Sequence, residues 1–362
     1  MKHNKLSITR KTISVGLIGP GLIGSALLQQ IHHVTKQSSS SKPVNFYVHG
    51  IMKSKRMLLT HSPIDLETWE NQLHQCDTAS NLNAFIEHML VNKKTNPVII
   101  DCTASKDVSR EYLNMLRKGI HVITPNKHAN AGELDYYKQI KQQTISGNAR
   151  YFYEATVGAG LPIISTLQDM IKTGDRVLKI ECVISGTLNY IFSELAKGRL
   201  FSDVVMEAKR LGVTEADPRE DLSGMDVARK LVCLAREIGY DTDLAHVNVH
   251  SLIPTELSSC KNIDDFYEKL PNYDSQMQEL VSKAAAVNQQ LCYVGAIDTN
   301  GEVSISIKSF SQDHPFTRLG KKNNMLIFHT QRYHEAPLII EGPVAGEELT
   351  AAGIFADLLR LV

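Results

Sequence analysis

The sequence predicts an α/β protein that combines a doubly wound parallel sheet with a central α+β domain. Its 362 residues are too many for one small hydrophobic core, so two domains are expected. Strand-like and helix-like patterns alternate over roughly the first 150 residues, as in doubly wound sheets. Later strand patterns occur as a hairpin and as isolated runs between helices, which is typical of an α+β domain.

The composition excludes several classes of protein. Thirty-nine basic and 39 acidic residues balance, so charge indicates neither a nucleic-acid nor a membrane-surface partner. No apolar run approaches the roughly 20 residues that a membrane span requires. The six cysteines form no CxxC motif, which fits a reducing compartment, and we expect a cytoplasmic protein. The basic segment 1–11 has no cleavage-type site and is interpreted as a chain terminus.

The first strand and helix enclose a glycine motif. Residues 12–18 are β-branched and apolar, residues 25–34 have helical spacing, and GPGLIG lies between them. In a dinucleotide-binding turn, the first glycine allows the tight turn, the second admits the pyrophosphate, and the third lets helix and strand pack. Free N–H groups at the helix start would bind the phosphates. The expected contacts are Gly19, Gly21, Leu22, Ile23 and Gly24, although a βα connection without a ligand has the same pattern.

The second strand, 44–52, ends in basic residues. An NAD-preferring site usually has an acidic residue here, but the chain continues Lys53-Ser54-Lys55-Arg56. Lys53 and Lys55 could pair with a ribose 2′-phosphate, which favours NADP. A solvated basic loop explains the pattern equally well.

The remaining elements of the first domain place two polar turns at strand ends. Helices are predicted near 80–92, 106–118 and 132–145, and strands at 97–102, 120–124 and 150–154. Ligands of such sheets lie outside the carboxyl ends of the strands. Thr103, in one turn, could contact a cofactor, and Lys127, in the other, could reach an anionic or carbonyl oxygen. Either segment could equally be an ordinary turn, since Ser, Asn and Pro are common in turns.

An unusual turn covers residues 154–162. Gly158 and Gly160 alternate with apolar residues, and glycines permit backbone angles that direct alternate carbonyl groups inward. Such carbonyls can form an oxygen cage for a hard cation. Alternatively, the turn caps the next helix, predicted at 161–173.

The middle and later chain predicts a mixed or antiparallel sheet. Strands are expected at 177–184, 325–332 and 338–341, a hairpin at 291–297 and 303–307, helices near 188–197 and 202–211, and a last helix from about Glu347.

The stretch TEADPREDLSGMDVARKL, residues 214–231, holds the densest set of charged residues. Pro218 interrupts regular structure, and Ser223 is predicted to cap a helix that ends at Gly239, with Asp226 in a capping box. Asp226 and Lys230 are four residues apart and share a helix face. A lysine beside the core with carboxylates around it could hold an amino-acid-like substrate and pass a proton. An ordinary ion pair at a helix edge has the same spacing.

Taken in order, the motifs resemble those of homoserine dehydrogenases, above all the dehydrogenase portion of bifunctional aspartokinase–homoserine dehydrogenases. The resemblance covers nearly the whole chain. Its motifs are GPGLIG, NPVIIDCTAS, HVITPNKHAN, ATVGAGLP, SGTLNYIF, TEADPREDLSGMDVARKL and EGPVAG…TAAGIFADLLR.

The resemblance implies a Rossmann-type domain over 1–152, completed by 342–362, and a substrate-binding and dimerisation domain over 153–341. It implies reversible NAD(P)H-dependent reduction of L-aspartate 4-semialdehyde to L-homoserine, in threonine, methionine and isoleucine biosynthesis. NADP is the expected cofactor, with NAD as the alternative, and a homodimer is the expected assembly. The rivals are a dehydrogenase of another amino acid or aldehyde, and a dinucleotide-binding sensor without catalysis.

Residue roles follow by position from the same resemblance. Lys230 corresponds to the proton donor, with Asp226 favouring its charged form and Lys127 as a second candidate donor. Thr103, Lys127 and Gly346 correspond to cofactor contacts. The substrate would be held by Thr187, Glu215, Asp221 and Asp226, and a monovalent cation, Na⁺ or K⁺, by backbone oxygens of Glu154, Val157, Ala159 and Leu161.

The sequence departs from the family pattern in three respects. His128 stands where a second lysine is common, and Val344 stands where a glycine is common. A valine takes positive φ with difficulty, so the cofactor approach there is expected to differ. No kinase-sized segment precedes these motifs and nothing follows Val362, so threonine feedback through a C-terminal sensing domain is not expected.

Overall fold

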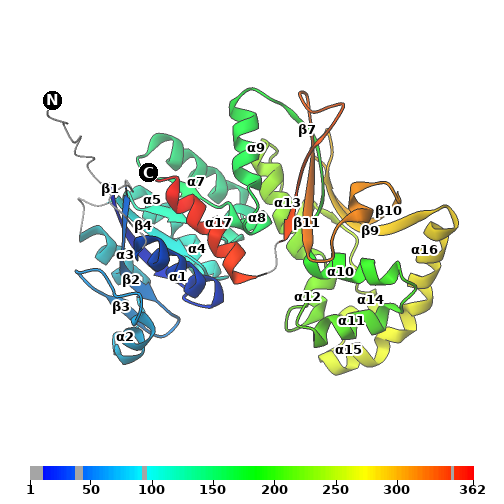
Figure 1. Cartoon of the computed structure of the whole chain (residues 1–362), viewed down its shortest axis with the longest axis horizontal. Helices are drawn as coiled ribbons and strands as arrows, with labels where there is room; N and C mark the ends of the chain where they lie inside the picture. Colours follow the sequence, from blue (N-terminus) through cyan, green and yellow to red (C-terminus); the bar gives the residue numbers. More distant parts are fainter. Residues whose placement is uncertain (1–10, 37–43, 92–95, 344–345) are drawn as a thin grey trace, which may run out of the picture. The chain divides into compact units, whose positions relative to one another are not determined.

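The computed structural model describes residues 11–36, 44–91, 96–343 and 346–362. The basic leader, the polar run after residue 36 and Val344 lie outside this part. The chain divides into two compact units (Figure 1). The first unit comprises 1–160 and 346–362, and the second comprises 161–345. The sequence-based boundaries were 152 and 341, before the short helix Ala155–Gly158 and within the last strand.

The first unit contains the predicted doubly wound sheet. Its strand order is β3-β2-β1-β4-β5-β6, and all neighbours are parallel except β3, which is antiparallel to β2. The chain winds outward from β1 through β2, and from β4 through β6 on the other side, so β1 and β4 flank the switch point where ligands bind in such sheets. The strands are β1 Lys11–Ile18, β2 Val44–Met52, β3 Met57–Leu59, β4 Asn96–Asp101, β5 His121–Ile123 and β6 Tyr151–Phe152.

Apolar side chains of β1 form the centre of the first core. Ile13, Val15 and Leu17 are completely buried, as a central parallel strand covered on both faces requires. Helix α1, Leu22–Lys36, packs beside helix α17, Glu347–Leu359, although they come from opposite ends of the sequence (Figure 1). The last helix therefore completes the core of the first unit.

The other helices of the first unit agree in part with the sequence-based prediction. The helix predicted at 106–118 is divided at Glu111, and the short helices α2, α6 and α8 were not predicted. The bounds are α2 Trp69–Gln75, α3 Leu82–Val91, α4 Lys106–Arg110, α5 Tyr112–Arg117, α6 His128–Ala131, α7 Leu134–Ser146 and α8 Ala155–Gly158.

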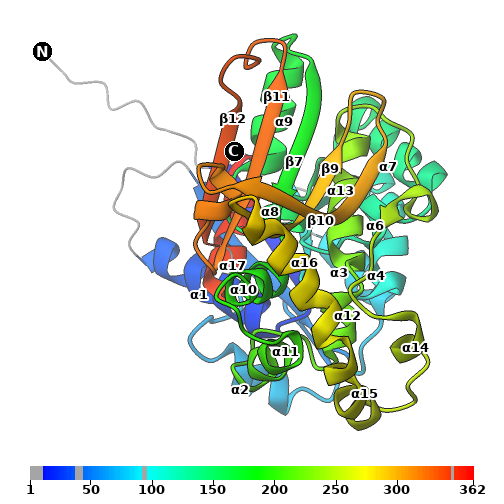
Figure 2. The same cartoon turned by 90° about the vertical axis from the view of Figure 1, so that its right-hand side faces the viewer.

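The second unit is built on a mixed sheet of order β12-β11-β7-β9-β10-β8. Figure 2 shows β12, β11, β7, β9 and β10 of this sheet. All its neighbouring pairs are antiparallel except β10 with β8. The strands are β7 Val177–Val183, β8 Asn248–Val249, β9 Gln289–Ile297, β10 Val303–Ser311, β11 Asn323–Thr330 and β12 Leu338–Pro343. The predicted α+β character is confirmed.

Helices α10, Gly186–Leu195, and α13, Met225–Glu237, cover one face of this sheet. Phe192 of α10 stacks on Tyr293 of β9, and a side chain on Gly295 would collide with Leu231 of α13. Because side chains alternate along a strand, residues between these face the other way, into a second cluster around Val294. The sheet thus positions α13 near the carboxyl-terminal end of β7.

The remaining helices of the second unit are α9 Ile163–Lys172, α11 Phe201–Arg210, α12 Pro218–Leu222, α14 Thr255–Ser258, α15 Ile263–Lys269 and α16 Asp274–Ala286. All six cysteines are free thiols. Among the described residues, no helix has both the length and the apolar character to cross a membrane.

Candidate functional site

The glycine turn has the geometry that its motif predicts. Gly19 has φ +85°, and a Cβ on Gly24 would lie 2.4 Å from the Gly19 carbonyl oxygen, so neither position accepts a side chain without rearrangement. A Cβ on Gly21 would meet no atom within 4 Å. Leu22, at the start of α1, is 78% exposed. The turn therefore presents open backbone at a helix N-terminus, where a pyrophosphate can bind.

The turn after β4 lies against the glycine turn at the switch point. Ile18 and Asp101 are register partners, and the Cys102 N–H donates to the Ile18 carbonyl oxygen at 2.8 Å. A Cβ on Gly19 would lie 2.6 Å from Thr103 Cγ2. The structure thus brings Thr103 together with the predicted phosphate-binding glycines.

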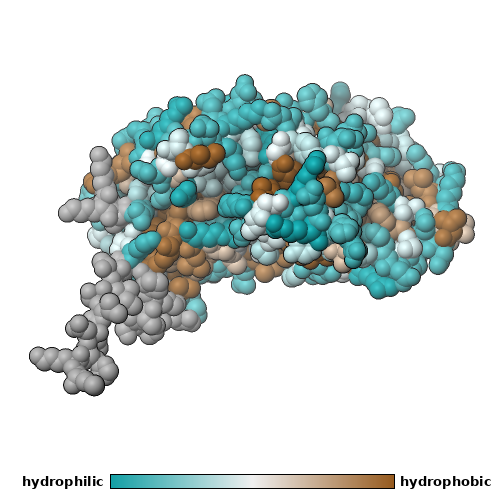
Figure 3. All heavy atoms as spheres, turned by 90° about the horizontal axis from the view of Figure 1, so that it is seen from above, coloured by the Kyte–Doolittle hydropathy of each residue, from teal (hydrophilic) through white to brown (hydrophobic). Residues whose placement is uncertain are grey.

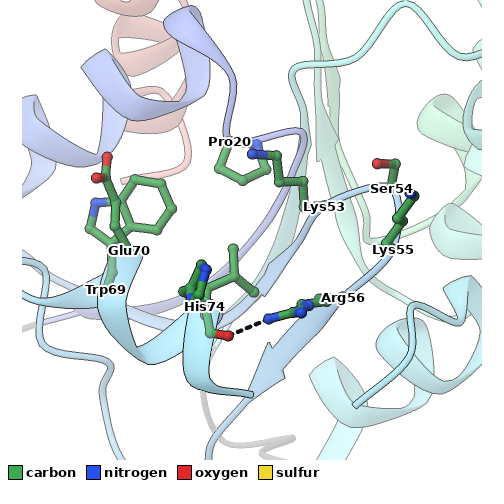
Figure 4. Close-up of a pocket in the computed structure, with 9 residues that line it drawn as sticks. Pro20, Lys53, Ser54, Lys55, Arg56, Trp69, Glu70 and His74 are labelled. Carbon is green, nitrogen blue, oxygen red and sulfur yellow. Dashed lines mark hydrogen bonds between the residues drawn. The ribbon is translucent and has the colours of Figure 1, made fainter. Parts of the chain in front are cut away.

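A pocket of about 490 Å³ lies beside the glycine turn and the end of β2 (Figure 4). It is lined by Pro20 of the turn, by Lys53, Ser54, Lys55 and Arg56, and by Trp69, Glu70, Leu73 and His74 of α2. The Lys53 N–H donates to the Arg56 carbonyl oxygen at 2.8 Å, which folds the basic segment into a tight turn. Three cationic side chains therefore line a cavity that adjoins the dinucleotide turn.

Sequence reasoning missed the opposite wall of this pocket. Arg56 donates to the His74 carbonyl oxygen, which ties the basic turn to α2 (Figure 4). Trp69 is buried, with 7% exposure. No periodic pattern marked residues 69–75 as a helix, whereas Arg56 directly follows the predicted basic pair.

Lys127 lies in the turn after β5, at the start of α6. Its carbonyl oxygen accepts the Ala131 N–H at 2.8 Å, and His128 donates its N–H to Asn126 Oδ1 at 3.0 Å. Lys127 is the N-cap of the short helix α6, which begins at His128. Gly346, the other predicted cofactor contact of this unit, has φ +120° and immediately precedes α17.

The turn predicted to bind a cation contains a strained residue. Ala159 has φ +52° and ψ −106°, a conformation that L-residues rarely adopt. The Glu154 carboxylate is buried and ion-paired with Arg360 at 3.0 Å, so the backbone oxygen of Glu154 is the ligand expected there. Val157 is buried within α8, and Leu161 is the first residue of the second unit. Among the described residues, no cluster of three His, Cys, Asp or Glu side chains could hold a metal ion. Backbone carbonyl oxygens are ligands of the kind that a hard cation takes.

Lys230 is anchored in the second unit by two partners. Its Nζ donates to the Ile184 carbonyl oxygen at 2.9 Å and pairs with Asp226 Oδ2 at 2.9 Å. The Lys230 side chain is 14% exposed, against 50% for Asp226. The predicted i,i+4 pair therefore forms, and it fixes an ammonium group just beyond the carboxyl end of β7.

The predicted N-cap of α13, Ser223, is wrong by one residue, although Ser223 Oγ accepts the Met225 N–H at 3.2 Å. Asp217 is extended and caps α12 by accepting the Arg219 N–H at 3.0 Å, with Pro218 in the first helical turn. Ser223 ends that helix, and Gly224, with φ +72°, connects it to α13. Proline is favourable at a helix start, so a separate short helix, α12, precedes α13, which begins at Met225.

Asp221 connects the other predicted substrate residues of the second unit. Its Oδ2 accepts the Glu215 N–H at 2.8 Å, and its Oδ1 lies 2.8 Å from Thr187 Oγ1. Thr187 Oγ1 also lies 2.7 Å from the Val213 carbonyl oxygen, and a single hydroxyl proton can serve only one of the two acceptors. Burial raises the pKa of Asp221, and the negative charge of Asp226 adds to this shift.

This part of the site therefore combines one held ammonium group with several carboxylates. Lys230 pairs with Asp226, and Asp221 bonds Thr187 and the Glu215 backbone, while the charge of Asp226 acts on Asp221. The exposed Glu215 side chain completes an acidic surface that suits the ammonium group of an amino acid. A fixed Lys230 suits proton donation to a forming alkoxide.

Comparisons with known proteins match both units. A family model described as homoserine dehydrogenase matches residues 162–359, and one described as its NAD binding domain matches residues 19–154. A bifunctional aspartokinase/homoserine dehydrogenase 2 from Zea mays, a chloroplastic protein, is 46% identical over 99% of this chain and 39% of its own length. The chain thus spans about two fifths of the curated bifunctional relatives that it matches.

Other relatives match from end to end. Homoserine dehydrogenase of Schizosaccharomyces pombe is 37% identical over 99% of this chain and 97% of its own length. A Candida auris protein of unknown function has a crystal structure with a TM-score of 0.91 and 36% identity, covering 97% of this chain and 98% of that one. A hyperthermophilic archaeal homoserine dehydrogenase, solved with NADPH, shares the fold, with 22% identity, a TM-score of 0.73 and coverage of 96% and 97%. The chain belongs to the homoserine dehydrogenase family.

Proposed function

We propose that this chain catalyses the reversible, nicotinamide-dependent conversion of L-homoserine to L-aspartate 4-semialdehyde. The observation that carries the proposal is the ammonium of Lys230, which is anchored by the Ile184 carbonyl oxygen and Asp226 in a unit that matches the homoserine dehydrogenase family. The full-length relative named homoserine dehydrogenase supports the same activity.

A nicotinamide cofactor held by the glycine turn would supply the hydride for the carbon that bears the substrate oxygen. As the aldehyde is reduced, negative charge develops on its oxygen, and Lys230 stabilises that charge and then donates a proton. Asp226 stabilises the charged lysine. Glu215 and Asp221 hold the substrate's ammonium group, so a substrate without an amino group binds weakly. Lys127 is a second candidate donor.

The preferred cofactor in this proposal is NADP. The 490 Å³ pocket beside the glycine turn carries Lys53, Lys55 and Arg56 where an NAD-preferring site would carry an acid. Arginine and lysine both bind phosphate, so these residues suit a ribose 2′-phosphate. NAD would use the same turn with lower affinity. Gly346 and Thr103 would contribute backbone and side-chain contacts to the cofactor.

A monovalent cation belongs to the same proposal. Its ligands would be the backbone oxygens of Glu154, Val157, Ala159 and Leu161, and the strained Ala159 supports a specialised role for this turn. Added Na⁺ or K⁺ is expected to raise activity after dialysis into a buffer that contains only bulky organic cations. A cation that raises activity to the same extent in a variant with the turn rebuilt would contradict this assignment.

We also propose a homodimer in a reducing, cytoplasm-like compartment, acting in threonine, methionine and isoleucine biosynthesis. Strand β12 ends the second unit's sheet and leaves Ile339 40% exposed, which supports an interface there. Hydrophobic residues lie in separate places among hydrophilic ones on the face drawn in Figure 3, so hydropathy alone does not select the interface. Sedimentation of the purified protein measures the assembly. The free thiols support a reducing compartment.

One steady-state experiment tests the activity. Purified protein is assayed with L-homoserine and with unrelated hydroxy acids, each with NADP⁺ and NAD⁺, with and without Na⁺ or K⁺. We expect homoserine oxidation, faster at low cofactor concentration with NADP⁺. Oxidation of another hydroxy acid in preference to homoserine would identify a different dehydrogenase. Cofactor binding without turnover of any substrate would identify a sensor.

A further inference from the structure

The first unit contains a buried hydrogen-bond hub that the proposed reaction does not use directly. Asp101, the last residue of β4, is completely buried and is surrounded by Thr103, Tyr112, Thr124 and Asn126. A buried carboxylate is costly unless several donors satisfy it. Asp101 lies at the switch point, between the turn after β4 and the turn after β5. This position indicates a role for the buried carboxylate in holding the two turns.

Asp101 binds the turn after β4 through one oxygen. Its Oδ1 accepts the Thr103 N–H at 2.8 Å, and the Ser105 N–H in turn donates to Thr103 Oγ1 at 3.0 Å. Thr103 packs against Gly19, so this oxygen also fixes the wall of the glycine turn.

The other oxygen of Asp101 binds the turn that carries Lys127. Its Oδ2 accepts the Asn126 amide at 3.1 Å and the Tyr112 hydroxyl at 2.5 Å. The orientation of the Asn126 amide is fixed, because its nitrogen also donates to the Ser105 carbonyl oxygen at 2.9 Å and its oxygen accepts the His128 N–H. Lys127 lies between these two held residues.

We propose that Asp101 is a positioning residue, which holds the Thr103 turn and the Asn126–His128 turn in the register that hydride transfer requires. This inference rests on the proposed function, because those turns carry the predicted cofactor contacts Thr103 and Lys127. Asp101 touches neither substrate nor cofactor in this scheme. It acts through the backbone of Thr103 and the side chain of Asn126.

The variant Asp101→Asn separates the two arms of the hub. The asparagine oxygen can still accept the Thr103 N–H, but its NH₂ group then faces the fixed NH₂ group of Asn126, and two donors cannot bond to each other. Tyr112→Phe is the matched control. It removes a donor from the same carboxylate oxygen and the contact with Thr124 Oγ1 at 3.0 Å, but leaves the bonds from Asp101 to Thr103 and Asn126 in place.

Steady-state kinetics with homoserine and NADP⁺ test the proposal. A misplaced reacting group lowers turnover, so we expect kcat of Asp101→Asn to fall about 10- to 100-fold, with KM for NADP⁺ changed less than about threefold. Tyr112→Phe is expected to keep kcat within about twofold of the wild type, even if both variants melt earlier. Asn126→Ala should resemble Asp101→Asn, and the double variant should be no worse than either single one. Equal effects of Asp101→Asn and Tyr112→Phe on kcat would overturn the proposal.

Amide hydrogen exchange provides a readout that is independent of activity. We expect faster exchange over residues 125–131 in Asp101→Asn and Asn126→Ala, and wild-type exchange there in Tyr112→Phe. If the wild-type protein does not oxidise homoserine, the proposed function fails, but exchange still decides whether Asp101 holds the turns. Unchanged exchange over 125–131 in both Asp101→Asn and Asn126→Ala overturns the positioning role. If Asp101→Asn does not fold, Asn126→Ala tests the same arm.

Discussion

Lys230 is held by the Ile184 carbonyl oxygen and by Asp226, which leaves its ammonium group little freedom. An exposed i,i+4 ion pair contributes little to stability. Here, the lysine is mostly buried and its second partner is a carbonyl oxygen at the end of a strand, so the two partners fix the position of the Lys230 ammonium group. That fixed position is what a proton donor requires.

Lys230→Ala is therefore expected to lower kcat about 10²- to 10⁴-fold, because a general acid contributes a factor of this size. NADPH binding, followed by fluorescence, should be unchanged. Lys283→Ala is the matched control, because Lys283 forms an i,i+4 pair with Glu279 on another helix with both side chains exposed. Turnover of Lys230→Ala near that of the control would remove Lys230 from the mechanism.

Lys53 and Lys55 should determine the preference for NADP over NAD, since both line the pocket beside the glycine turn. Replacing both by alanine is expected to lower kcat/KM for NADP⁺ about 10-fold or more, because charge-assisted bonds to phosphate are strong. The kcat/KM for NAD⁺, which lacks the 2′-phosphate, should stay within about twofold of the wild type. Lys118→Ala, which removes a lysine that pairs with Glu87 and does not line the pocket, should change neither value. An equal decrease in kcat/KM with both cofactors would show that the lysines do not bind the 2′-phosphate.

The first βα unit shows how two glycines of one motif can differ in their roles. Gly24→Ala places a methyl group 2.4 Å from the Gly19 carbonyl oxygen, so it should lower the free energy of unfolding by about 1–3 kcal/mol. Gly21→Ala meets no atom within 4 Å and should leave stability nearly unchanged. It should nevertheless weaken NADP⁺ binding, because the methyl group occupies the space of the pyrophosphate. Urea unfolding and cofactor titration of both variants distinguish the packing role of Gly24 from the cofactor-binding role of Gly21. An equal loss of stability in the two variants would contradict this assignment.

The joint between α10, α11 and the segment before β11 depends on one buried carboxylate. Glu194 is 5% exposed and accepts bonds from Lys197, Arg199 and Lys321. The hydrogen bond from Lys197, then that from Lys321, lower the pKa of Glu194 to about 2. Because the folded pKa lies below the ordinary 4.5, the stabilisation is complete above pH 4.5 and is lost as the pH falls towards 2.

Glu194→Gln should therefore lower the free energy of unfolding by about 1–2 kcal/mol at pH 7, since three hydrogen bonds lose the negative charge of their acceptor. The difference from the wild type should shrink as the pH falls from 4.5. Denaturant unfolding at several pH values measures this. Glu279→Gln, which alters the exposed pair with Lys283, is the control and should differ little at pH 7. A difference that stays constant with pH would contradict the assigned role.

At the scale of the whole molecule, cofactor binding should stabilise the two units unequally. A ligand at 100 times its Kd adds about 2.7 kcal/mol to the state that binds it. NADPH should slow hydrogen exchange in the glycine turn, the basic turn after β2 and the turn after β4. Strands β9 and β10 should be little affected. The Gly21→Ala variant is the control and should show weaker protection at the same NADPH concentration, whereas protection confined to β9 and β10 would place the cofactor elsewhere.

Much of this architecture could be predicted from sequence because its signals are local. A buried strand followed by GPGLIG and a helical period identifies the first βα unit, and alternation over the next hundred or so residues predicts the winding of the sheet. The N-cap of α13 was predicted at Ser223, but Pro218 starts the separate helix α12, Ser223 is its C-cap, and Gly224 is the N-cap of α13. The Asp101–Asn126 bond joins residues 25 positions apart, and no spacing rule points to it.

The path of the chain through α17 also constrains the order of folding during synthesis. The second unit's sheet is complete once β12, which ends at Pro343, has left the ribosome, but Ala351, Ile354, Phe355 and Leu358 of the first core are still to come. Until α17 packs, the nascent first unit therefore exposes apolar surface beside α1 while the second unit folds. Chaperones that bind apolar surface are expected to bind the first unit, which is synthesised first, for the longest time.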